Sequence, residues 1–194
     1  MRRIDALRII AEHTAQLPVV VTCAASSREL AAVADRPNQL YLLDSMGLAG
    51  SVATGLALAL ADTPIPRVVT VEGDGSLLMN PNVLATGGFL RPDKLVMVLL
   101  DNAVYGATAD LPTYADAIDL GALAEAAGWT VRRAADSAEL AAELPGVLAA
   151  DGPVLLHVRI EAGNAPNVPK LLEDPVIIGR RFQDWLAARG GELA

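Results

Sequence analysis

The sequence contains little of several features that would define a class of function. It has one cysteine, Cys23, in 194 residues, so neither a disulfide framework nor a cysteine-ligated iron–sulfur cluster can form within the chain. Aromatic residues make up only 4% of it, and 15 Lys and Arg face 23 Asp and Glu. The resulting net charge of −8 argues against a nucleic-acid backbone or an anionic membrane as the partner.

Long apolar runs are also lacking. The longest, GLAGSVATGLALALA at residues 47–61, is shorter than the roughly 20 residues of a membrane-spanning helix and predicts a buried helix instead. The N-terminal stretch MRRIDALRIIAEH is too broken by charge for a secretory signal. We therefore expect a cytoplasmic protein that binds neither membranes nor nucleic acid.

Short apolar runs alternate with segments of helical periodicity along the chain. The expected strands lie within residues 18–24, 39–47, 67–76, 94–102, 129–134 and 152–160, and the expected helices within 4–17, 26–34, 47–61, 80–90, 113–128, 137–150 and 174–190. This alternation predicts an α/β fold, a doubly wound parallel sheet with helices on both faces, as a single domain over residues 1–194. Ser26 or Ser27 and Asn80 are expected to cap their helices.

Two polar turns follow two of the expected strands. VEGDGSLLMN places Asp74 between two glycines after one strand, and LLDNAVYG places Asn102 after the next. Ligands of such sheets bind beyond the carboxyl ends of the strands, where both turns are expected. Backbone N–H groups of a glycine turn favour phosphate oxygens, and carboxylate, amide and carbonyl oxygens suit Mg²⁺ or Ca²⁺. The residues therefore predict a metal-bridged diphosphate.

The two turns together resemble the cofactor-binding signature of the thiamine-diphosphate (ThDP) enzymes, in the domain that holds the diphosphate. The resemblance implies that Mg²⁺ is bound by the side chains of Asp74 and Asn102 and by the carbonyl group of Val104. It implies that Ser76 and the backbone of Gly75 hold the diphosphate. The remaining cofactor-binding residues that it implies are Gly73, Tyr105 and Gly106.

A second segment, DSMGLAGSVATGLALAL, resembles the part of these enzymes that receives the aminopyrimidine ring. The resemblance implies that Met46 wedges under the cofactor and forces it into a bent conformation. It also implies that the backbone carbonyl of Asp44 accepts a hydrogen bond from the 4′-amino group, with Ser45 beside it. Glycine is usual in the family where this chain has Asp44.

A wider resemblance, which includes SSREL and EAGNAPNVP, is to the β subunit of sulfopyruvate decarboxylases and the C-terminal half of phosphonopyruvate decarboxylases. Those enzymes remove CO₂ from a 2-oxo acid with a strongly anionic head group and release an aldehyde. In the ThDP family an activating glutamate comes from another domain, across a subunit interface. The resemblance therefore implies a partner subunit that carries the pyrimidine-binding domain and this glutamate, and it leaves no certain catalytic residue in this chain.

Two other functions stay open at this stage: carbon–carbon ligation of the acetolactate-synthase kind, and a non-catalytic scaffold subunit. Arg28, after the first strand, could contact an anionic substrate or a carboxylate group of the partner, or it could form a salt bridge on a helix surface. His157 is expected in the core, His13 on the surface, and Cys23 as a small buried apolar residue.

Overall fold

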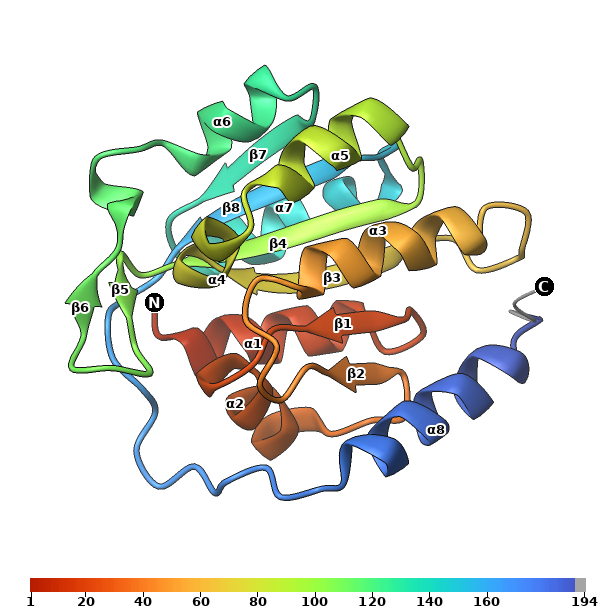
Figure 1. Ribbon diagram of the computed structural model, residues 1–194, viewed down its shortest axis with the longest axis horizontal. Coiled ribbons are helices and arrows are strands. Elements are labelled where there is room, and N and C mark those ends of the chain that lie inside the picture. The colour runs from red at the N-terminus through yellow and green to blue at the C-terminus, as the bar shows by residue number, and fades with distance from the viewer. Residues whose placement is uncertain (191–194) are drawn as a thin grey trace.

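The computed structural model describes residues 1–190, and its centre is a six-stranded sheet in which all neighbouring strands run parallel. The strands are β1 (Val19–Val21), β2 (Gln39–Tyr41), β3 (Val68–Gly73), β4 (Leu95–Asp101), β7 (Thr130–Ala134) and β8 (Val154–Arg159). Their order is β2-β1-β3-β4-β8-β7 (Figure 1). Strand β2 therefore lies on one side of β1, and β3 lies on the other side. This reversal of direction along the sheet confirms the doubly wound topology.

Helices cover both faces of the sheet. One face carries α1 (Arg3–His13), α2 (Ala25–Ala34) and α7 (Ser137–Ala149), and the other carries α3 (Ala49–Ala59), α4 (Asp74–Met79), α5 (Asn82–Leu90) and α6 (Leu120–Ala126). The last helix, α8 (Pro175–Ala187), packs beside β2 at the edge of the sheet (Figure 1). Within residues 1–190, no helix combines the length and the apolar character needed to cross a membrane.

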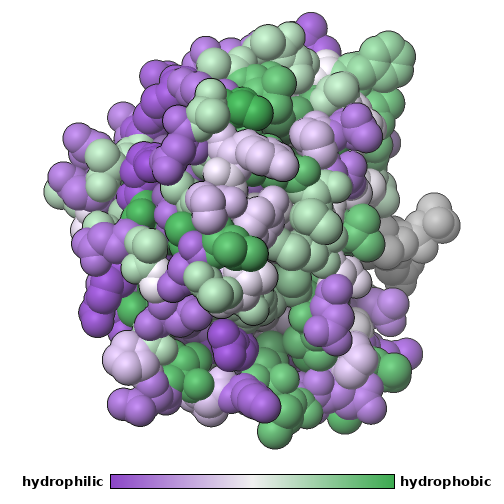
Figure 2. Space-filling view, turned by 60° about the vertical axis from the view of Figure 1, so that its left-hand side comes forward, coloured by the Kyte–Doolittle hydropathy of each residue, from purple (hydrophilic) through white to green (hydrophobic). Residues whose placement is uncertain are grey.

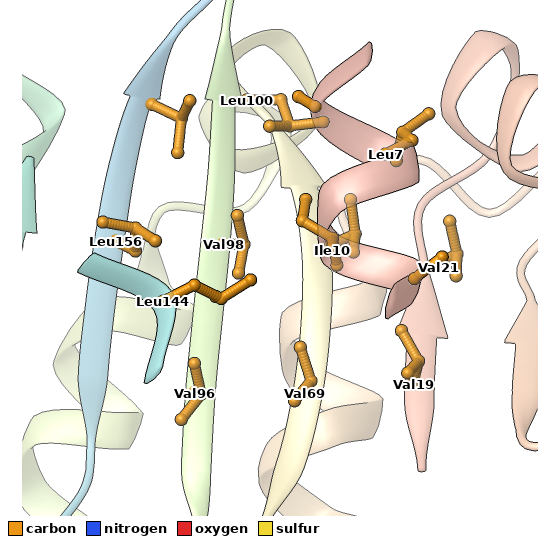
Figure 3. Close-up of a cluster of buried hydrophobic side chains, with 14 of the residues drawn as sticks. Leu7, Ile10, Val19, Val21, Val69, Val96, Val98, Leu100, Leu144 and Leu156 are labelled. Carbon is orange, nitrogen blue, oxygen red and sulfur yellow. The ribbon is translucent and has the colours of Figure 1, made fainter. Parts of the chain in front are cut away.

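Each strand supplies both hydrophobic cores, because successive side chains of a strand point to opposite faces of its sheet. Val19 and Val21 enter the core beneath α1, whereas Val20 enters the core beneath α3. Figure 3 shows the first of these cores, where side chains from helices α1 and α7 lie over those of the central strands. Burial on both faces explains why the sequence of β4 is almost uniformly apolar.

Both expected helix caps are wrong. Helix α2 begins at Ala25 after Ala24, whose φ of 62° turns the chain sharply, so the two serines lie inside the helix. The hydroxyl group of Ser27 donates instead to the carbonyl oxygen of Thr22 at 2.6 Å. Pro81, not Asn80, occupies the N-cap of α5, and the Asn80 amide donates to the carbonyl oxygen of Gly47 at 3.1 Å.

Four short elements around the glycine turn and the following loop were not expected. Residues after Gly73 form helix α4 rather than an open turn, and the loop after β4 forms a hairpin of β5 (Val104–Tyr105) and β6 (Leu111–Pro112). The helix expected over residues 113–128 is divided into a 3₁₀ turn, η1 (Tyr114–Asp116), and α6. These elements surround the carboxyl ends of β3 and β4.

The contact of α5 with the end of α6 gives a test of the packing. A Cβ atom added at Gly88 would fall onto the carbonyl oxygen of Ala127. We expect Gly88→Ala to lower the free energy of unfolding by about 1–3 kcal/mol, because an extra carbon in a filled site forces its neighbours to move. Gly55→Ala is the matched control, since an added Cβ there meets nothing within 4 Å. That change is expected to raise the free energy of unfolding by about 0.5–1 kcal/mol. Urea denaturation of both variants measures the difference, and equal effects would contradict the packing.

Candidate functional site

A cavity of about 150 Å³ lies beyond the carboxyl ends of β1, β3 and β4. The residues expected to bind the cofactor that line it are Met46, Gly73, Asp74, Gly75, Ser76, Asn102, Val104, Tyr105 and Gly106. Strands β3 and β4 are direct neighbours, with Gly73 opposite Leu100 in the register. The two turns that follow these strands are therefore brought together at one edge of the sheet.

Asp74 begins α4 and is only 2% exposed. The Thr113 hydroxyl group donates to its Oδ2 at 2.6 Å, and the backbone N–H of Asn102 donates to its Oδ1 at 3.4 Å. Neither donor carries a positive charge. Burial raises the pKa of the Asp74 carboxyl group, the nearby charge of Asp101 adds to the rise, and the Thr113 hydrogen bond opposes it. A buried carboxylate in such surroundings is stabilised by a bound cation.

Asn102 lies in a tight turn after β4, and Val104 begins β5 at the end of that turn. The backbone N–H of Ala103 donates to Asp101 Oδ1, and that of Val104 donates to Asn102 Oδ1, both at 3.1 Å. Ala103 has a φ of 60°, in the left-handed region, and its carbonyl oxygen accepts from the backbone N–H of Thr113 at 2.9 Å. The amide oxygen of Asn102 keeps a second lone pair for a ligand.

Asp101, the last residue of β4, holds this turn in place. Its Oδ2 lies 2.7 Å from both His157 Nε2 and Arg159 Nη1. Burial alone would raise the pKa of the Asp101 carboxyl group, but the hydrogen bonds from His157 and Arg159 outweigh burial and hold that pKa below its usual value. Asp101 is therefore ionised and fixes the backbone that presents Asn102. The expectation of His157 as a satisfied core residue is confirmed.

Ser76 joins the glycine turn to two other segments. Its hydroxyl oxygen lies 2.8 Å from the hydroxyl oxygen of Thr22 and accepts from the backbone N–H of Gly47 at 2.9 Å. The segment that carries Met46 is therefore tied to the start of α4. At Gly75, an added Cβ would lie 2.6 and 2.7 Å from two ring atoms of Tyr105. Glycine is needed there because the aromatic ring approaches the backbone closely.

Two further ionisable groups lie close by. Glu72 is 1% exposed and accepts from the backbone N–H groups of Gly50 at 3.3 Å and Gly73 at 3.2 Å. Burial raises the pKa of its carboxyl group, and these contacts give it a role in holding α3 against β3. Cys23 is half-buried and lines the cavity, so the expectation of a buried residue is wrong. Burial raises the pKa of the Cys23 thiol, which makes it a poor nucleophile.

The remaining sequence candidates lie beside this cavity. Asp44 and Arg28 line an adjoining cavity, and Ser45 is exposed and lines neither cavity. The salt bridge on a helix surface that was one expected role of Arg28 is not formed among residues 1–190. His13 is exposed, as expected, with its Nδ1 2.9 Å from the carbonyl oxygen of Ile9.

Sequence reasoning missed two threonines that hold the site. Thr22 directly follows β1, so its place at the carboxyl end of a strand could have been noted beforehand. Thr113 follows β6, a strand too short to recognise, and its partner Asp74 is 39 residues away in the chain. For Thr113 the sequence carries no corresponding signal.

The donors around the cavity fit a hard cation bound to a phosphate-bearing ligand. They comprise one carboxylate, one amide oxygen and backbone carbonyl oxygens, which are ligands that Mg²⁺ prefers. In the part of the chain that the structure describes, no group of three or more His, Cys, Asp or Glu side chains could hold a metal. A cation at Asp74 thus needs further oxygens from its ligand, as Mg²⁺ commonly takes them from phosphates.

The hydrogen bond between Thr113 and Asp74 can be tested separately. We expect Thr113→Val to weaken Mg²⁺-dependent binding of thiamine diphosphate by about 10- to 100-fold, because a hydrogen bond to a charged group contributes about 1.5–3 kcal/mol. Thr130→Val, at an exposed position on β7, is the matched control and should leave binding unchanged. Isothermal titration measures both. Binding equal to wild type in the Thr113 variant would show that this contact does not support the site.

Comparison with known proteins adds independent information on the family of this chain. Residues 22–158 match the family model described as thiamine pyrophosphate enzyme, C-terminal TPP binding domain. The chain is 42% identical over 182 residues to sulfopyruvate decarboxylase subunit beta of Methanothermobacter thermautotrophicus, covering 94% of each chain. It is 40% identical to phosphonopyruvate decarboxylase of Streptomyces viridochromogenes, covering 95% of this chain but 46% of that protein.

Two weaker similarities complete the comparison. Acetolactate synthase isozyme 1 large subunit of Escherichia coli is 28% identical over 160 residues, which cover 75% of this chain and 28% of that protein. The structure of benzoylformate decarboxylase from Polynucleobacter necessarius superimposes with a TM-score of 0.68 at 22% identity. It covers 83% of this chain and 33% of that one, a likeness of fold alone.

Proposed function

Because this chain belongs to the thiamine pyrophosphate enzymes, through their C-terminal TPP binding domain, we propose that it is the diphosphate- and Mg²⁺-binding subunit of a two-subunit 2-oxo acid decarboxylase. The substrate is an acid with a sulfonate or phosphonate head group. The observation that carries this proposal is the convergence of Asp74 and Asn102 on one cavity at the ends of neighbouring strands.

The names and lengths of two relatives support a decarboxylase made of two subunits. The protein from M. thermautotrophicus is named as a beta subunit and has nearly the same length as this chain, since the match covers 94% of both. The Streptomyces relative is about twice as long, because the match covers 46% of it. We infer that the partner of such a beta subunit carries the part that the longer relative holds within one polypeptide.

The residues around the cavity have distinct roles in this proposal. Asp74, Asn102 and the carbonyl group of Val104 hold Mg²⁺, while Ser76 and the backbone of Gly75 hold the diphosphate. Met46, which also lines the cavity, would support the bent cofactor. When bound, thiamine diphosphate supplies the electron sink that takes up the electron pair left by departing CO₂. Thr113 and Asp101 keep the ligand side chains in place.

An apolar surface near the cavity supports the proposal that the chain binds a partner subunit. We define the partner surface as Met46, Leu48, Val52 and Met79, whose exposed fractions are 37%, 46%, 37% and 61%. The face of the molecule in Figure 2 shows hydrophobic residues extending over its centre and upper right, with hydrophilic residues along its left border. Exposed apolar side chains that gather beside a binding site mark a protein interface. The partner subunit supplies the pyrimidine-binding domain and the activating glutamate.

The two rival functions are less well supported. Carbon–carbon ligation has a relative in acetolactate synthase, but that similarity is more distant at 28% identity. A scaffold subunit that has lost its cofactor has no need to keep Asp74 buried and bonded to Thr113. The donor set around the cavity therefore favours an active subunit.

The test is a reconstituted complex of the chain with its partner, assayed with Mg²⁺ and thiamine diphosphate on sulfopyruvate, phosphonopyruvate and pyruvate. We expect CO₂ and an aldehyde from at least one acid with an anionic head group, and much slower turnover of pyruvate. Formation of an acetolactate-type product would establish ligation instead. A complex that binds no thiamine diphosphate would establish the scaffold.

A further inference from the structure

A second cavity, of about 450 Å³, adjoins the cofactor cavity. The two share Ala24, Gly106 and Ala107 in their linings, so they lie directly beside each other. None of the residues proposed to hold Mg²⁺ lines the second cavity. A ligand in the second cavity would thus lie beside the proposed metal site but would not share its residues.

Two positively charged side chains line this second cavity. Arg28 comes from α2, and Lys170 from the extended segment between β8 and α8. The Nε of Arg28 is buried and has no hydrogen-bond partner among the described residues. Two other arginines, Arg3 and Arg181, form ion pairs with Glu29 and Asp35, although Arg181 Nε itself also lacks a hydrogen-bond partner. A buried guanidinium nitrogen without a partner is costly, and an anion in the cavity would satisfy it.

The segment that leads from β8 to Lys170 is held in place at its start. Asn164 donates to the carbonyl oxygen of Gly106 at 3.1 Å and accepts from Arg3 Nη1 at 3.0 Å. The backbone N–H of Ala165 donates to Glu29 Oε1 at 3.0 Å. These bonds tie the start of the segment after β8, which runs around the lower edge of the molecule to α8 in Figure 1, to α1, α2 and the loop that lines the cofactor cavity.

The charge of the cavity suits an anion despite one opposing group. The carboxylate of Asp44 also lines it, so the two cations exceed the carboxylates by one. Within the described residues, Asp44 forms no ion pair with Arg28 or Lys170, which leaves both cations available. This excess positive charge is local, because the whole chain has a net charge of −8.

Resting on the proposed function, we propose that Arg28 and Lys170 bind the sulfonate or phosphonate head group of the substrate and select acids that carry one. The head group, rather than the carboxylate, belongs here for a physical reason. The carboxylate loses its charge when CO₂ departs, so cations around it would stabilise the substrate more than the transition state. The head group keeps its charge throughout, so the same cations stabilise both equally and position the 2-oxo carbon over the neighbouring cavity.

The test compares Arg28→Gln and Lys170→Gln with Arg132→Gln, an exposed residue of β7, in the reconstituted complex. We expect each of the first two changes to raise KM for sulfopyruvate or phosphonopyruvate about tenfold or more. They should leave kcat/KM for pyruvate and the affinity for thiamine diphosphate within about twofold of wild type, because pyruvate has no anionic head group. The control should change none of these values.

A second measurement does not require turnover. Titration of the complex with phosphonoacetate and sulfoacetate should show binding that Arg28→Gln weakens about tenfold or more. If the complex decarboxylates none of the acids but this weakening is found, the reaction class is wrong and the anion site is right. Equal losses with pyruvate and the anionic acids, or unchanged phosphonoacetate binding in both variants, would overturn the proposal.

Discussion

Asp74→Asn is expected to abolish Mg²⁺-dependent binding of thiamine diphosphate at concentrations where the wild-type protein is saturated. The substitution keeps the size of the side chain and its hydrogen bond from Thr113 but removes the negative charge that faces the cation. Removing one charge from a buried pair costs about 3–5 kcal/mol, which is about two to four orders of magnitude in affinity. Isothermal titration with thiamine diphosphate and Mg²⁺ measures this loss, and activity of the complex should fall with it.

The matched control for this change is Asp110→Asn. Asp110 is exposed on the loop between β5 and β6 and has a φ of 53°, a backbone conformation that asparagine also adopts readily. We expect it to bind the cofactor like wild type. Asp74→Asn should also unfold at no lower denaturant concentration than wild type in the absence of metal, because it removes a buried charge. Normal cofactor binding by a folded Asp74→Asn protein would contradict the proposed ligand set.

The second large effect concerns the partner. The isolated chain is expected to show less than about one thousandth of the decarboxylase activity of the complex, because a catalytic acid or base contributes about 100- to 10,000-fold and the proposed glutamate belongs to the other subunit. Activity should appear on mixing and saturate at a fixed ratio of the two chains. Steady-state assays at increasing partner concentration measure this dependence.

A pair of surface variants separates assembly from folding. Leu48→Asp changes the partner surface, whereas Leu123→Asp changes a residue of similar exposure on α6, 39% against 46%. A charge at an apolar interface weakens association, so only the first variant should need more partner for the same activity. Full activity of the chain alone would refute the two-subunit account.

The arrangement of the site could be foreseen because it follows from local patterns. The apolar runs identify β3 and β4, and neighbouring parallel strands end at the same edge of a sheet. The meeting of Asp74 and Asn102 therefore required only the correct strand ends, and the register of Gly73 against Leu100 confirms it. The individual ligand roles remain predictions.

The elements that complete the site could not be foreseen, because tertiary contacts decide them. Helix α4 has six residues, too few to be stable alone, and Leu77, which is 1% exposed, packs it into the core. Strand β6 includes Pro112, and proline is rare in strands other than those at the edge of a sheet. Asn164 and its partner Gly106 are 58 residues apart, and no sequence period connects them.

The cation position is the central claim and can be measured directly. Crystals of the complex grown with thiamine diphosphate and Mn²⁺, which takes the same octahedral oxygen ligands as Mg²⁺, give an anomalous signal from the metal alone. We expect one peak about 2.1 Å from an Asp74 carboxylate oxygen, the Asn102 amide oxygen and the Val104 carbonyl oxygen, in contact with the diphosphate. A bound cofactor whose metal lies away from both Asp74 and Asn102 would contradict the account.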